Sequence, residues 1–230
     1  MSDLCKWLHE NLELLPLIRF PFKLECLPRN GICFFYEDGE IWGHGGNKPR
    51  IVRIGTHRGW NFRNRIAEHY LLDDRKMDFS VDKPKPSDRS VFRLNIGRAL
   101  LNQRGDEYLQ IWNKDFIKKE NRVRFGRLRD INKEKEIEFE ITRILRQNFS
   151  FRFIELNVQR KRMDKEGLES ALIGTVAHCN LCKPSFQWLG NYSPKSQIRE
   201  SGLWLVQHLK AHEINEEDKR TILNAINKRE

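Results

Sequence analysis

Two short runs of strand-forming residues, followed closely by a helical pattern, constrain the fold of this chain most strongly. Residues 31–36, GICFFY, and residues 51–55, IVRIG, are rich in aromatic and β-branched side chains. Asp38 and Gly39 follow the first run, and this dipeptide predicts a tight hairpin turn because glycine tolerates a positive φ. The segment therefore predicts an antiparallel pair of strands that leads into a helix.

That helix carries a cation and an imidazole side by side. Phe62, Ile66 and Tyr70 recur every four residues and predict its buried face. Arg65 and His69, also four residues apart, predict a neighbouring stripe. A guanidinium matches phosphate oxygens, and an imidazole can relay a proton near neutral pH. The pair therefore indicates a phosphodiester site, with a surface stripe of ion-paired side chains as the alternative.

The order and spacing of these elements resemble the GIY-YIG nuclease superfamily. Its pattern is a GIY strand, a YIG strand, and a helix with Arg and, four residues on, His or Tyr. Here residues 31–33, GIC, and residues 53–55, RIG, lie at the two strand motifs, and the Arg/His pair matches the helix. Cys33 and Arg53 therefore stand where the family has tyrosines.

The resemblance also implies a metal-binding Glu on a later helix and an Asn beyond it. Residues 168–173, LESALI, are similar to that helix and place Glu169 as the ligand of one Mg²⁺ or Mn²⁺ ion. Asn180 lies at a family-like distance, and Asn191 is a second candidate. The implied reaction is metal-dependent hydrolysis in one cleft, without a covalent intermediate.

The replaced tyrosines leave the general base open, because in the family they orient or deprotonate the nucleophilic water. His57, just after the second strand, is the first choice and His69 the second. A thiolate at Cys33 could accept a proton if nearby cations lowered its pKa, and Arg53 could bind phosphate. Tyr36 is a poor replacement because alternation along a regular strand points it to the opposite face.

The remaining periodicities predict an α/β (α+β) fold with a small three-stranded, mostly antiparallel sheet flanked by helices. The third strand is expected near residues 149–156, where large apolar and polar residues alternate. Helices are predicted at residues 2–15, 91–101, 133–146, 165–177 and 217–228, with loops at 43–47 and 73–90. We expect one GIY-YIG-like domain over residues 1–230, with its core at 28–70 and 149–182, a basic insertion at 71–148 and a C-terminal extension at 183–230.

The charge balance favours a polyanionic partner. The chain holds 42 Lys and Arg against 32 Asp and Glu, a net charge of +10, and phosphate neutralisation supplies most sequence-independent affinity for nucleic acid. A cationic run in the insertion is expected either to grip DNA or to form a solvated face, with RNA left open as a substrate. Its candidate binding residues are Lys118, Lys119, Arg122, Arg124 and Arg127.

Cysteine content and hydropathy limit the possible location of the protein and the kinds of metal site it can hold. Five cysteines without a framework spacing suggest a reducing, cytoplasmic location, and no apolar run reaches the length of a membrane span. Cys179 and Cys182 form a CxxC next to His178, but structural zinc needs four ligands and no second pair follows. Zinc is therefore not expected. Trp188 and Trp204 are expected to anchor the extension rather than to stack on bases.

These inferences predict a Mg²⁺- or Mn²⁺-dependent DNA endonuclease, with a restriction or defence role as one setting and a monomer or a homodimer as the assembly. The alternative is a nucleic-acid-binding module that keeps the nuclease scaffold but has lost catalysis with its two tyrosines.

Overall fold

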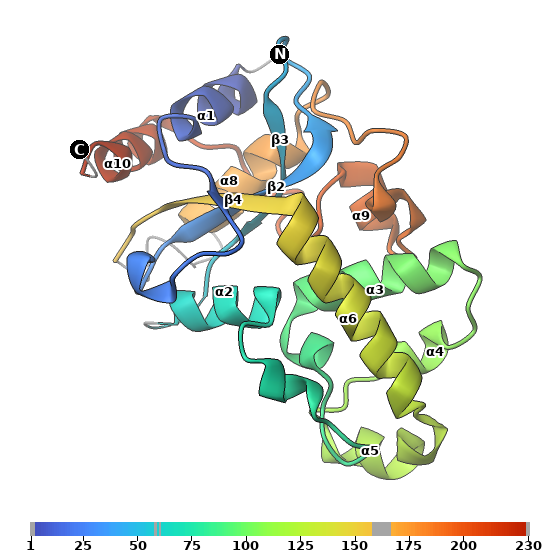
Figure 1. The fold of residues 1–230 in the computed structure, drawn as a ribbon. Coiled ribbons are helices and arrows are strands. Elements are labelled where there is room, and N and C mark those ends of the chain that lie inside the picture. The colour runs from blue at the N-terminus through green and yellow to red at the C-terminus, as the bar shows by residue number, and fades with distance from the viewer. Residues whose placement is uncertain (1–2, 58, 60, 158–166, 229–230) are drawn as a thin grey trace.

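A four-stranded antiparallel sheet lies at the centre of the computed structural model, which describes residues 3–57, 59, 61–157 and 167–228 (Figure 1). Its strands lie in the order β1-β4-β2-β3. They are β1 (Ile18–Arg19), β2 (Ile32–Ile41), β3 (Pro49–Gly55) and β4 (Phe149–Ile154). The predicted fold class is confirmed, and the two-residue β1 adds a fourth strand beside β4. β3 forms the opposite edge of the sheet.

The connection between β2 and β3 differs from the prediction. β2 continues through Asp38 and Gly39, where a φ of +85° at Gly39 and a shift in register mark a bulge. The turn predicted at Asp38-Gly39 is therefore wrong. The chain reverses instead through residues 42–48, which contain the predicted glycine-rich connection at 43–47.

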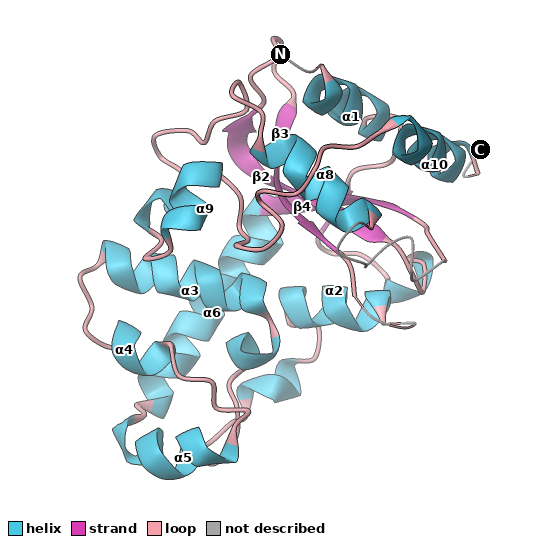
Figure 2. Cartoon of the chain, turned by 180° about the vertical axis from the view of Figure 1, so that it is seen from behind, coloured by secondary structure: helices cyan, strands magenta, loops and turns pink. Residues whose placement is uncertain are grey.

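Helices cover both faces of the sheet (Figures 1 and 2). Cys33 and Phe35 pack on one face with α2, α3 and α6, whereas Ile32, Phe34 and Tyr36 pack on the other with α1, α8 and α10. This alternation of β2 side chains divides the core into two layers. The helices of the described residues are α1 (Leu4–Leu12), α2 (Phe62–Tyr70), α3 (Val91–Gln103), α4 (Leu109–Trp112), α5 (Lys119–Phe125), α6 (Ile131–Asn148), α8 (Leu168–Ala177), α9 (Ser196–Ser201) and α10 (Glu216–Asn227).

Five helix predictions correspond to α1, α3, α6, α8 and α10, although α8 is described only from Leu168 onward and the predicted start at Lys165 lies outside the described residues. The expected loop at 73–90 contains two 3-10 turns, Asp74–Met77 and Pro86–Arg89, and buries Phe79. None of the described helices is long and apolar enough to cross a membrane.

The C-terminal extension is anchored by two tryptophans, as predicted. Trp188 and Trp204 are buried with their ring centroids 5.0 Å apart. Both indole N–H groups donate to Oε2 of Glu37, at 2.8 and 2.9 Å. Because both rings are buried, their faces cannot stack on bases.

Candidate active site

Five of the predicted site residues, Arg53, His57, Arg65, His69 and Glu169, lie near one another at the end of β3. α2 lies on one face and α8 on the other, and side chains from both layers approach the end of β3, which is the last strand of the described sheet. Oε1 of Glu169, in the first turn of α8, accepts a hydrogen bond from the backbone N–H of Thr56 at 2.9 Å. The partial positive charge of a helix N-terminus favours a carboxylate there.

Arg53 brings a cation to this edge. Its side chain lies on the face covered by α2 and α3, with the guanidinium carbon 4.8 Å from the centroid of Phe92, and it donates to the carbonyl of Trp204. Burial, and then the charge of Arg65, lowers the pKa of Arg53 to about 10, while Glu169 acts in the opposite direction. Arg53 is therefore a charged group within electrostatic reach of both Arg65 and Glu169.

Arg65 and His69 share a face of α2 but differ in environment. Arg65 is 30 % exposed, and its Nη1 donates to Glu68 at 2.6 Å and to the carbonyl of Arg89 at 2.7 Å. His69 is buried, with Nδ1 2.7 Å from Oγ of Ser90. Burial, together with the charges of Arg53 and Arg65, holds the pKa of His69 well below its usual range. The imidazole is therefore neutral at pH 7, and the pair is not an exposed ion-pair stripe.

His57 and Thr56 continue the chain from β3 into the site. His57 is buried against Phe62, with ring centroids 5.5 Å apart, and is near enough to influence the pKa of His69. Oγ1 of Thr56 donates to the carbonyl of Gly31 at 2.7 Å, while its N–H donates to Glu169. Thr56 thus connects the first strand motif to α8. Thr56 was not predicted from the sequence, where its one signal was its position directly after Gly55.

Cys33, which stands at the position of a family tyrosine, lies in the core of the molecule. It pairs with Gly55 across the hairpin and is buried in the core layer beside α2. Burial raises the pKa of the Cys33 thiol well above its ordinary value, so the lowered pKa that a thiolate base would need is absent. Tyr36 lies in the other core layer, on the opposite face from Cys33, as alternation along the strand predicted.

Neither candidate asparagine contacts Glu169. Asn180 is exposed beyond the C-terminal end of α8, whereas Glu169 lies in its first turn. A helix of 10 residues separates its ends by about 15 Å. Asn191 uses its amide to donate to the carbonyls of Ser185 and Phe186. Chain spacing suggested Asn180, but the direction of α8 carries it away from the site.

The candidate nucleic-acid residues lie on and beside α5, at the far end of the molecule from α8 (Figure 1). Lys118, Lys119, Arg124 and Arg127 are exposed, whereas Arg122 is half-buried and donates to the carbonyls of Phe116 and Ile117. Arg129, which ends the same cationic run, is buried and ion-paired with Glu134 at 2.6 Å. Four of the five candidates are thus exposed to a ligand.

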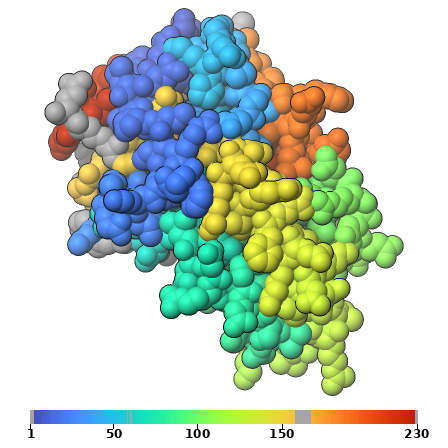
Figure 3. Space-filling model, viewed as in Figure 1, coloured from blue at the N-terminus to red at the C-terminus, as the bar shows by residue number. Residues whose placement is uncertain are grey.

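Two surface cavities lie between α5 and α2. One of about 430 Å³ is bordered by Lys119, Arg122 and Arg127, together with Val81 and Asp82. The other, of about 510 Å³, is bordered by Glu68 of α2 and by the exposed cations Lys76, Lys83 and Arg89. Segment 71–90 and α5 form the lower part of the molecule in Figure 3. Basic side chains therefore extend from α2 to α5.

Comparison with known families found one relationship. The family model described as the GIY-YIG domain matches residues 21–229. The match spans both strand motifs, the insertion and most of the C-terminal extension. No match was found among curated proteins or among solved structures.

Proposed function

The chain belongs to the GIY-YIG family, a family of nucleases, and from this premise we propose that it is a divalent-metal-dependent endonuclease acting on DNA. The observation that carries the proposal is the meeting of Arg53, Arg65, Glu169 and two histidines at the end of β3. Phosphodiester hydrolysis needs positive charge on the phosphate, a base for the attacking water and a metal or acid for the leaving group, and these residue types supply the first two.

Arg53 and Arg65 are assigned to the scissile phosphate. A guanidinium stays protonated even with the lowered pKa of Arg53, and its planar fork matches two phosphate oxygens. Arg53 replaces a tyrosine hydroxyl with a cation, so it would stabilise the developing charge of the transition state rather than handle a proton. His57 is assigned as the general base because it follows Thr56, whose amide contacts Glu169.

Glu169 is assigned to the metal ion. Mg²⁺ binds through one or two carboxylates and fills its other positions with water and substrate oxygens, and the half-buried carboxylate of Glu169 fits that pattern. The ion would supply positive charge at the scissile phosphate when bound. Thr56 would hold the carboxylate in place through its backbone N–H.

The exposed cations between α2 and α5 are assigned to the DNA backbone. Lys76, Lys83 and Arg89 lie next to Glu68, the ion-pair partner of Arg65. Lys119 and Arg127 continue the basic surface at the second cavity. A duplex in contact with this surface would have its phosphates neutralised on one side while a scissile bond lies at Arg65. We name the exposed cations Lys76, Lys83, Arg89, Lys119 and Arg127 the basic track.

Cleavage of supercoiled plasmid in Mg²⁺ tests this function. Wild-type protein and Glu200→Gln, which changes an exposed carboxylate on α9, are expected to nick or linearise the plasmid. Glu169→Gln is expected to lose cleavage while retaining plasmid binding, because a neutral amide is a poor Mg²⁺ ligand. Cleavage that persists in Glu169→Gln would refute the assignment of Glu169.

A second candidate is a nucleic-acid-binding module without catalysis. The observation that favours it is the buried thiol of Cys33 at the position of a family tyrosine. It predicts salt-sensitive DNA binding, with no cleavage by either the wild-type protein or the Glu169→Gln variant. Wild-type cleavage that depends on Glu169 excludes this candidate.

A further inference from the structure

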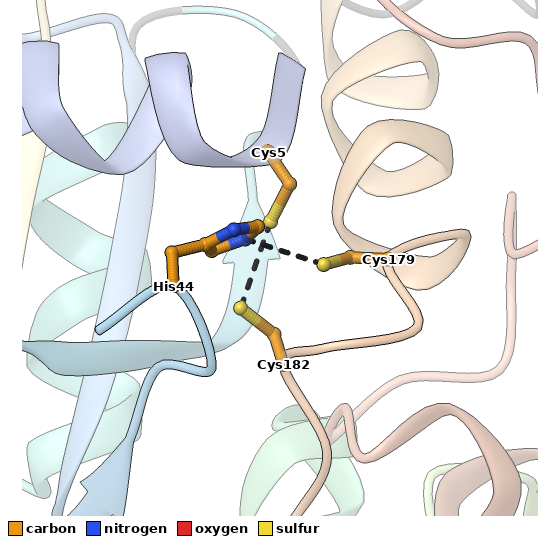
Figure 4. A group of neighbouring side chains, drawn as sticks. All are labelled: Cys5, His44, Cys179 and Cys182. Atoms are coloured by element: carbon orange, nitrogen blue, oxygen red, sulfur yellow. Dashed lines mark hydrogen bonds between the residues drawn. The ribbon is translucent and has the colours of Figure 1, made fainter. Parts of the chain in front are cut away.

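Four potential metal ligands from three distant segments meet on the side of the sheet that carries α1 and α8. Figure 4 shows Cys5 on α1, His44 in the β2–β3 connection, and Cys179 and Cys182 in the segment after α8. Their ligand atoms all lie within 4.8 Å of one another. Zinc was not expected from the sequence because no further ligands follow the CxxC. In the structure the other two candidate ligands precede the CxxC by more than 130 residues.

The distances among these atoms suit one tetrahedral ion. Sγ of Cys5 lies 3.8 Å from Sγ of Cys182, and Nε2 of His44 lies 3.3 Å from Sγ of Cys179. Tetrahedral zinc, with Zn–S near 2.3 Å and Zn–N near 2.0 Å, places two sulfurs about 3.8 Å apart and a sulfur and a nitrogen about 3.5 Å apart. The cysteines are not in disulfides.

The backbone around the cluster is arranged for sulfur ligands. Backbone groups of Leu181 and Cys182 hydrogen-bond the sulfur of Cys179, and the backbone of Gly43 hydrogen-bonds that of Cys182. Such outer contacts orient the ligands of a metal site. A Cβ at Gly43 would lie 1.9 Å from the carbonyl oxygen of Leu181. Only glycine at this position lets the β2–β3 connection approach Leu181 closely enough to place His44 beside the cysteines.

A second histidine beside the cluster is held out of the ligand set. Nε2 of His9 accepts the backbone N–H of Ile51 at 3.1 Å, which leaves Nδ1 to donate to the carbonyl of Cys5 at 2.8 Å. Both ring nitrogens of His9 are thereby used. The set is then three thiolates and one imidazole, which is the closed arrangement of a structural zinc site.

We propose that Cys5, His44, Cys179 and Cys182 bind one structural Zn²⁺ ion. Thiolate ligands favour zinc over Mg²⁺, so this ion would be distinct from the one assigned to Glu169. It would join α1, the β2–β3 connection and the end of α8, and so hold α8 against the hairpin that carries Arg53. A cavity of about 130 Å³ bordered by Cys5, His44 and Cys179 gives the ion a path to the cluster.

Elemental analysis of the purified protein tests the proposal. Wild-type protein and Cys26→Ser, which changes an exposed cysteine outside the cluster, are expected to contain about one zinc ion per chain. Cys182→Ser and His44→Ala are expected to lose zinc. Full zinc occupancy in both of those variants would overturn the assignment.

Because the variants can lose zinc by failing to fold, a second measurement uses the wild-type chain alone. Stepwise reaction of its thiols with an organomercurial is expected to release zinc in proportion to the modification of the three cluster cysteines, Cys5, Cys179 and Cys182. Replacement by Co²⁺ is expected to give the thiolate-to-metal absorption of a tetrahedral site. Wild-type protein that contains no zinc and takes up no Co²⁺, that contains iron instead, or that holds a Cys5–Cys182 disulfide would refute the proposal.

Discussion

The carboxylate of Glu169 and the backbone N–H of Thr56 are joined by a 2.9 Å hydrogen bond across 113 positions of the chain. This bond connects the first turn of α8 to the residue that follows the second strand motif. It places the carboxylate next to Arg53 although α8 packs on the opposite face of the sheet from α2. The site therefore combines side chains from both faces of the sheet at the end of β3.

Shortening the carboxylate tests how closely this geometry controls the reaction. Glu169→Asp keeps the charge but withdraws it by one methylene, and a displacement near 1 Å can cost roughly 100-fold in rate. We expect the single-turnover cleavage rate in Mg²⁺ to fall by roughly 100-fold, with the DNA dissociation constant unchanged. A variant that cleaves at the wild-type rate would show that Glu169 does not hold the ion.

The general base is tested by replacing each histidine. We expect His57→Gln to lower the cleavage rate by roughly 100-fold or more, the range of a lost general base. It should also flatten the acidic limb of the pH–rate profile. His69→Gln should retain that limb, because the depressed pKa of His69 keeps its imidazole neutral throughout. A pH limb that disappears in His69→Gln and persists in His57→Gln would reverse the assignment.

The basic track is tested by the salt dependence of DNA binding. Lys119→Glu combined with Arg127→Glu should weaken binding and reduce the slope of log K against log salt by about 2, since each phosphate contact contributes about 0.9. The matched control is Lys210→Glu with Arg220→Glu, two exposed cations of the C-terminal extension. Arg220 lies on α10, which is at the other end of the molecule from α5 in Figure 1. Equal losses of affinity in the two double variants would mean that only net charge matters.

The two motif glycines are expected to respond differently to alanine. A Cβ at Gly31 would lie 2.4 Å from the carbonyl oxygen of Ile154, whereas at Gly55 the nearest atom, in Arg53, is 3.9 Å away. Gly31→Ala should lower the free energy of unfolding by about 1–3 kcal/mol or more through overpacking. Gly55→Ala should change it by less than about 1 kcal/mol. Chemical denaturation measures both, and a tolerant Gly31 would contradict the close approach of β2 and β4.

Glu37 is expected to make stability depend on pH. Burial raises the pKa of Glu37 from 4.5 to about 7, despite hydrogen bonds from Trp204 and Trp188. Between these pH values the folded chain binds more protons than the unfolded chain, so stability falls as the pH rises. Each pKa unit corresponds to about 1.36 kcal/mol. Relative to wild type, the free energy of unfolding of Glu37→Gln should therefore increase by up to about 3 kcal/mol as the pH rises from 4.5 to 7. Denaturant melts across that range measure the gain. A constant difference between variant and wild type would refute the raised pKa, and Glu200→Gln is the exposed control.

The sequence by itself determined the secondary structure and the residue types available to the candidate site. Apolar residues at strand and helix spacing predicted β2, β3 and β4 and the buried face of α2, because those patterns follow from backbone geometry alone. Motif order predicted Arg65, His69 and Glu169 as candidate site residues, and the match to the GIY-YIG family spans residues 21–229. The bulge at Gly39 escaped prediction because Asp-Gly favours a turn and a bulge alike.

The tertiary structure decided which segments that are distant in the sequence lie next to one another. It placed β3 at the edge of the sheet, brought Thr56 to Glu169, and carried Asn180 to the far end of α8. It buried Cys33 and Arg129, and it gathered Cys5 and His44 around the CxxC. Spacing along a chain reports neighbours within one helix or strand, whereas contacts between segments more than 100 residues apart depend on how whole elements pack.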